Sequence, residues 1–149
     1  MPTFQFRLAP VLRLRERTQE EKESELRALT LERARREAEI AALSAEFDRL
    51  DADLSAQTGL TVSPIDLKLR DEYAQLLIAA IERKQRDLAA LGEQAARKQQ
   101  ELTEAMRDVK SLESLRHRLA EEFRREQNVA EQKFLDELGR RRFYVKPAS

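Results

Sequence analysis

The sequence contains no cysteine, no tryptophan and only three glycines among its 149 residues. The absence of cysteine excludes disulfides and thiolate metal sites, and the single histidine, His117, leaves few ligands for zinc. The glycines are isolated at positions 59, 92 and 139, so no glycine-rich loop cradles phosphate. Paired acids such as Glu20 and Glu21 are typical of a solvated helix face. The sequence therefore predicts a protein that is not an enzyme and holds no cofactor or metal.

Long hydrophobic runs are also missing. The longest, Leu76–Ile81, has six residues and is too short to cross a bilayer. Met1–Pro10 lacks the apolar core of a signal peptide, so we expect a cytoplasmic protein. The 28 basic and 28 acidic residues balance, so no net charge attracts nucleic acid or membrane.

Two stretches of heptad-spaced apolar residues dominate what is present, with a short segment containing Gly59 and Pro64 between them. This spacing keeps one stripe of each helix facing a partner helix. It predicts an all-α protein, a long antiparallel two-helix coiled coil (an α-hairpin) that forms a single domain. We expect helix 1 over about 10–57, a turn over about 58–63, helix 2 over about 64–139, and a basic tail over 140–149. Ser63, Pro64 and Asp66 match the start of a helix, and Gly59 suits the end of one.

The pairing register along the seam, the line of contact between the helices, follows from the charged residues at heptad positions. Three registers fit the turn. Two of them place Arg33 opposite Lys84 or Lys98, which are like-charge layers. The middle register avoids such layers, and it places charged residues opposite apolar ones, as in Lys84 opposite Ile40 and Arg15 opposite Val109. Such side chains can extend along the seam and keep their charges in solvent. Its apolar layers are Phe47 with Leu77, Leu43 with Ile81, Leu29 with Ala95, and Leu12 with Leu112.

In the middle register, helix 2 extends past helix 1 from about Glu121 onward. An apolar face on an unpaired helix indicates a missing partner, or else self-association into a longer bundle. The residues left uncovered are Phe123, Val129, Ala130, Phe134, Leu135 and Leu138.

Two end segments carry a resemblance to a known family. Phe4–Glu16 combines two phenylalanines with Leu-x-Pro-Val-Leu and an Arg/Glu-rich helix start, and the closing segment Glu131–Phe143 reads EQKFLDELGRRRF. With the hairpin and its glycine-containing turn, the chain resembles the FliJ family of the bacterial flagellar type III export apparatus. The resemblance implies a coiled-coil stalk, similar to the central stalk of rotary ATPases, that binds the hexameric export ATPase and the cytoplasmic domain of the membrane export gate protein. It also implies a role in recycling export chaperones and a place at the inner face of the membrane at the flagellar base.

Site residues follow from this resemblance. An aromatic residue followed one turn later by Leu implies an export-gate contact at Tyr73 and Leu77. The uncovered, basic and aromatic end predicts contacts with the ATPase ring, since Arg suits carboxylates. The residues expected there are Phe4, Phe6, Phe123, Phe134, Leu138, Arg140, Arg141 and Arg142.

Two alternatives stay open. The chain could be the equivalent stalk of a non-flagellar type III secretion system. It could also be a nucleic-acid-binding coiled-coil arm, which would bind RNA or DNA with strong salt dependence. The mixed charges and the lack of aromatic residues along the middle of the chain disfavour this second alternative, so we expect no nucleic-acid partner.

Overall fold

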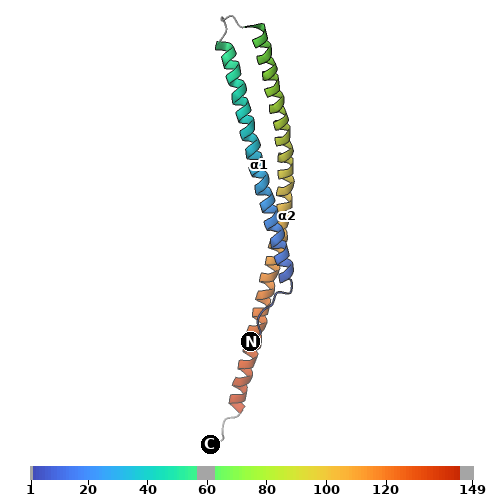
Figure 1. Ribbon diagram of the computed structural model, residues 1–149. Helices are drawn as coiled ribbons and strands as arrows, with labels where there is room; N and C mark the ends of the chain where they lie inside the picture. The colour runs from blue at the N-terminus through green and yellow to red at the C-terminus, as the bar shows by residue number, and fades with distance from the viewer. Residues whose placement is uncertain (1, 57–62, 145–149) are drawn as a thin grey trace. The chain divides into compact units, whose positions relative to one another are not determined.

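The computed structural model describes residues 2–56 and 63–144, which form two α-helices: α1, Ala9–Ala56, and α2, Pro64–Tyr144. The described residues contain no strand. The all-α antiparallel hairpin expected from the heptads is confirmed (Figure 1). The expected turn, with Gly59, and the residues of the basic tail beyond Tyr144 lie outside the described residues.

Three helix boundaries lie within the described residues, and two of them, the starts of α1 and α2, agree with the sequence signals. Helix α1 begins at Ala9, with Pro10 in its first turn, and its last described residue is Ala56. Helix α2 begins at Pro64 and carries Asp66 in its first turn. The expected end of helix 2 at Gly139 is wrong, because α2 continues to Tyr144. A single glycine weakens a helix without ending it. Arg141 and Arg142 in the last turn stabilise the helix, because their positive charges lie at the negative end of the helix dipole.

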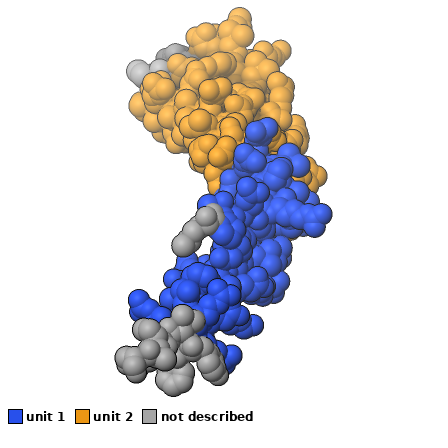
Figure 2. Space-filling view, turned by 90° about the horizontal axis from the view of Figure 1, so that it is seen from below, with its two compact units in different colours: residues 1–19, 104–149 blue, residues 20–103 orange. Residues whose placement is uncertain are grey.

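The chain divides into two compact units, shown in different colours in Figure 2. Unit 1 comprises Met1–Gln19 and Glu104–Ser149, and unit 2 comprises Glu20–Thr103. Each unit therefore contains a segment of both helices. That the whole chain forms one domain stays a prediction.

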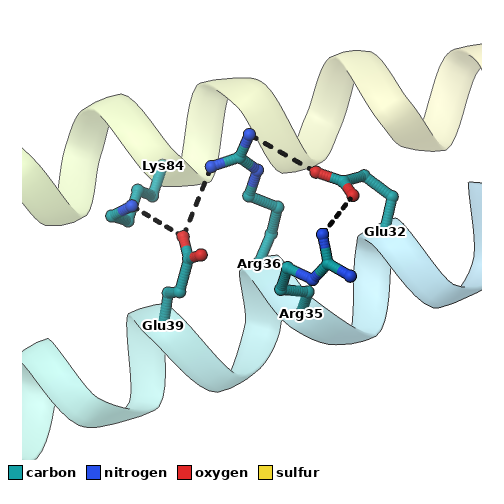
Figure 3. Close-up of polar contacts among 5 residues, drawn as sticks. All are labelled: Glu32, Arg35, Arg36, Glu39 and Lys84. Atoms are coloured by element: carbon teal, nitrogen blue, oxygen red, sulfur yellow. Dashed lines mark hydrogen bonds and ion pairs between the residues drawn. The ribbon is translucent and has the colours of Figure 1, made fainter.

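Unit 2 is held together by a narrow apolar seam with charged residues along its edges. Leu77, Ala95 and Leu102 are its buried apolar residues. Lysines reach across the seam to acids on the other helix: Lys22 to Glu101 at 2.9 Å, Lys98 to Glu25 at 2.8 Å and Lys84 to Glu39 at 2.6 Å. Figure 3 shows Glu39 between Lys84 of α2 and Arg36 of its own helix.

These ion pairs test the pairing register. In the middle register Lys22, Lys98 and Lys84 lie opposite Leu102, Leu26 and Ile40. Each lysine is paired with the acid immediately before that apolar residue. The other two registers would move these acids by a heptad, beyond the reach of the lysines. The ion pairs therefore agree with the middle register, and the lysines extend outward from the seam as expected.

Unit 1 also has an apolar seam with an ion pair at its edge, but this seam is shorter. Its buried residues are Leu12, Ala105 and Val109. Arg15, placed opposite Val109 by the register, pairs with Asp108 at 3.5 Å. Beyond Phe123, almost every described α2 side chain is exposed, so the uncovered end expected for helix 2 is present in this unit.

Candidate partner-binding surfaces

The described residues offer no site for metal chemistry and no membrane-spanning helix. No group of three or more His, Asp or Glu side chains in residues 2–56 and 63–144 lies close enough to hold a metal ion. Over the same residues, neither α1 nor α2 has a stretch sufficiently long and apolar to traverse a bilayer. The surfaces that remain to be explained are exposed apolar ones.

The first such surface lies on α2 in unit 2. Ile65, Leu69, Tyr73 and Leu76 follow one another at steps of four, four and three, which places them along one face of the helix. They are 70%, 57%, 42% and 68% exposed. We call these four residues the 65–76 stripe. An apolar stripe on one helix face is typical of a surface that a partner covers.

Tyr73 is fixed in orientation within this stripe. Its hydroxyl donates a hydrogen bond to Oε1 of Glu46 on α1. This hydrogen bond, with burial and the negative charge of Glu46, raises the pKa of Tyr73 above its ordinary value. The phenol is protonated at neutral pH, as any tyrosine with an ordinary or raised pKa is, and it acts as the donor to Glu46.

Leu77 occupies a different environment from Tyr73. It is only 5% exposed and belongs to the seam of unit 2, so its side chain is not available on the surface. The predicted pair is therefore split between the surface and the seam. Sequence reasoning missed Ile65, Leu69 and Leu76, although their spacing of four, four and three was a usable signal for a second stripe beside the seam.

The second surface lies at the end of α2 in unit 1. Phe134 and Leu138 are 61% and 44% exposed, and they are followed by exposed Arg140, Arg141 and Arg142. These arginines form no ion pair with any other described residue. We call these five residues the 134–142 surface. It combines apolar anchors with unpaired guanidinium groups, a composition typical of protein interfaces.

Three further residues were predicted to contact the export ATPase. They lie in unit 1 but do not belong to the 134–142 surface. The rings of Phe4 and Phe123 pack against each other with centroids 5.8 Å apart and an interplanar angle of 49°. Phe4, Phe6 and Phe123 are each half-buried. None of them is fully exposed. Direct contact of these three residues with the export ATPase therefore stays a prediction.

Comparison with known proteins shows the family to which the chain belongs. The family model described as the flagellar FliJ protein matches residues 4–148, which is nearly the whole chain. The chain belongs to the FliJ family. This membership identifies it as a component associated with flagellar protein export, and it favours the flagellar over the non-flagellar alternative. No curated protein and no solved structure matches the chain significantly.

Proposed function

We propose that this FliJ-family chain is a non-enzymatic stalk that links the hexameric export ATPase to the cytoplasmic domain of the export gate protein. The observation that supports the proposal is that the described residues of each unit include an exposed apolar surface. The 134–142 surface belongs to unit 1 and the 65–76 stripe to unit 2. A protein that connects two partners needs two such surfaces, whereas a single-partner subunit needs only one.

The ATPase ring is assigned to the 134–142 surface. Phe134 and Leu138 lie one helical turn apart, so both can enter one apolar groove of a partner. The unpaired arginines that follow can form bidentate hydrogen bonds with carboxylates. The partner surface that fits is therefore apolar with an acidic rim.

The export gate is assigned to the 65–76 stripe, with Tyr73 as its central residue. Glu72 lies three residues after Leu69 on the same helical face, and Glu46 accepts the Tyr73 hydrogen bond on the other side of the ring. An amphipathic segment with apolar residues and basic flanks complements this arrangement. Leu77 supports the stripe from the seam and does not contact the partner itself.

The remaining roles rest on family membership. We propose that the chain assists the recycling of export chaperones and that it associates peripherally with the inner face of the membrane at the flagellar base. Binding to nucleic acid is not part of the proposal, because no aromatic residue accompanies the cations along most of α2.

The linking function is tested by mixing the full chain with the export ATPase and the gate's cytoplasmic domain in analytical ultracentrifugation. We expect a complex that contains all three proteins and that does not form without the chain. If the ATPase and the gate domain instead displace each other from the chain, the two surfaces do not act as separate sites and the proposal is wrong.

A further inference from the structure

The segment Pro2–Phe6 runs outside secondary structure and precedes α1. Its residues alternate: Phe4 and Phe6 are half-buried, whereas Thr3 and Gln5 are exposed. Such alternation is typical of an extended segment that lies with one side on an apolar surface. The surface is on α2, because Phe4 packs on Phe123. We call Pro2–Phe6 the strap.

Few interactions hold the strap in place. Its one backbone hydrogen bond among the described residues is at its end, where the amide of Ala9 donates to the carbonyl oxygen of Phe6 over 3.1 Å. Pro2–Gln5 form no hydrogen bond or ion pair with the described part of the chain. The strap is therefore retained by its two aromatic side chains, and it can be lifted without breaking helix hydrogen bonds.

The strap covers the beginning of the face that ends in the 134–142 surface. Phe123, Ala130, Phe134 and Leu138 are separated by seven, four and four residues, so they continue one side of α2. Phe123 is half-buried beneath Phe4, while Phe134 and Leu138 are exposed. A partner that extends along this side of α2 from Leu138 toward Phe123 must meet the strap.

We propose that the strap is a displaceable cover that competes with the export ATPase for the α2 face at Phe123. This inference rests on the proposed function, because it assigns the ATPase to that end of α2. Phe4 then opposes ATPase binding instead of contributing to it. A direct contact and a competing cover predict opposite effects when the Phe4 ring is removed.

The first test is therefore the sign of the change caused by Phe4→Ala in the full chain. If the strap competes, the affinity for the export ATPase rises about two- to tenfold, the factor that corresponds to losing one aromatic pair. The matched control is Leu14→Ala, which removes an exposed apolar side chain from α1 of the same unit and should leave the affinity unchanged. A lower or an unchanged affinity of the Phe4→Ala chain overturns the inference.

The second test locks the strap shut. Because the chain lacks cysteine, Phe4→Cys with Phe123→Cys creates a unique pair that a short reducible thiol cross-linker can join. We expect the cross-linked chain to bind the ATPase more weakly than the same chain after release of the linker. The control pair, Leu43→Cys with Ile81→Cys in unit 2, should bind equally well before and after release.

The outcomes separate the two proposals. Equal binding by the locked and released straps overturns the strap, while the stalk assignment stands as long as the unmodified chain binds the ATPase. If the unmodified chain does not bind the ATPase at all, the proposed function is overturned and the competing role of the strap is overturned with it.

Discussion

Units 1 and 2 contain segments of the same two helices, but they use their charged residues differently. Unit 2 has 13 basic and 18 acidic residues, whereas unit 1 has 15 basic and 10 acidic ones, so their formal charges are −5 and +5. In unit 2, three lysines form ion pairs with acids on the other helix, across the seam. Among the described residues of unit 1 there is one such pair, Arg15 with Asp108, and the arginines of the 134–142 surface form no ion pair there.

The difference shows that a balanced overall composition can hide two oppositely charged parts. In unit 2 the lysines align the helices, because each has an acid within reach in one register only. In unit 1 the arginines of the 134–142 surface have no ion-pair partner among the described residues, so they are available to other molecules. The zero net charge of the whole chain therefore says little about what either unit binds.

The largest expected effect concerns the 134–142 surface of unit 1. Phe134→Ser combined with Leu138→Ser removes two exposed apolar anchors, and truncating anchors of this kind typically weakens binding about hundredfold in total. Isothermal titration of the export ATPase with the variant chain measures the loss. The control is Leu31→Ser with Met106→Ser, which removes two other exposed apolar side chains, 69% and 49% exposed, and should leave the affinity unchanged. Equal losses in both variants would show that general surface hydrophobicity drives binding.

The second prediction separates the two residues that the family resemblance implies for the export gate. Leu77→Ala removes a buried side chain from the seam of unit 2 and should lower the free energy of unfolding by about 2–3 kcal/mol. Tyr73→Ala changes an exposed side chain and should leave stability nearly unaltered. Urea unfolding followed by circular dichroism compares the two. Similar stability of both variants would contradict the placement of Leu77 in the seam.

A smaller gain in stability is expected from Arg33→Leu. Nε of Arg33 is buried in unit 2 without a hydrogen-bond partner among the described residues. In the middle register this side chain lies opposite Leu91, so leucine would complete an apolar layer. Removing an unsatisfied buried polar group should raise the free energy of unfolding by about 1 kcal/mol. A loss of stability in the same urea experiment would mean that the Arg33 guanidinium contributes through its other nitrogens.

The smallest effect concerns the pH dependence of unit 2. Hydrogen bonds from Lys98, Lys84 and Lys22 lower the pKa values of Glu25, Glu39 and Glu101 in the folded chain. The stabilisation from a carboxyl with a lowered pKa is present above its ordinary pKa of about 4.3 and is lost as the pH falls through the folded value. The hydrogen bond with Glu25 raises the pKa of Lys98, so its contribution is lost only at strongly alkaline pH.

We therefore expect the Tm of the chain to be constant near neutral pH and to decrease slightly between about pH 5 and pH 3. The decrease in Tm should be smaller for Glu25→Gln combined with Glu101→Gln than for the unmodified chain. The control Glu131→Gln alters an exposed acid of unit 1 and should show the same decrease as the unmodified chain. Because these ion pairs are partly exposed to solvent, added salt should reduce the effect. An identical acid decrease in all three chains would show that the pairs across the seam do not contribute.

Much of the fold could be predicted from the heptads because a two-helix seam needs only a repeating apolar position and compatible charges. The middle register placed Arg15 and Lys84 opposite apolar residues. It therefore predicted that these side chains extend outward from the seam and keep their charges in solvent. The end of α2 was misplaced because a single glycine resembles a helix stop, while the favourable effect of Arg141 and Arg142 at the helix end is weak in sequence.

The candidate surfaces could be predicted only in part. The exposed Phe134 and Leu138 followed from the register, since no α1 residue lies opposite them. The 65–76 stripe was missed because its residues share the helix with the seam, and spacing alone does not say which stripe is buried. The contact between Phe4 and Phe123 was beyond prediction, because it joins a segment without periodic structure to a helix distant in sequence.

The central claim is that each unit binds its own partner, and a crossed binding experiment tests it most directly. The export ATPase and the gate's cytoplasmic domain are each titrated with two variant chains, Phe134→Ser/Leu138→Ser in unit 1 and Tyr73→Ala/Leu76→Ser in unit 2. We predict that the first variant loses the ATPase and keeps the gate domain. The second should bind the gate domain at least thirtyfold more weakly, as expected for a central aromatic contact, and keep the ATPase. Loss of both partners by either variant, or the reverse assignment, would contradict the account.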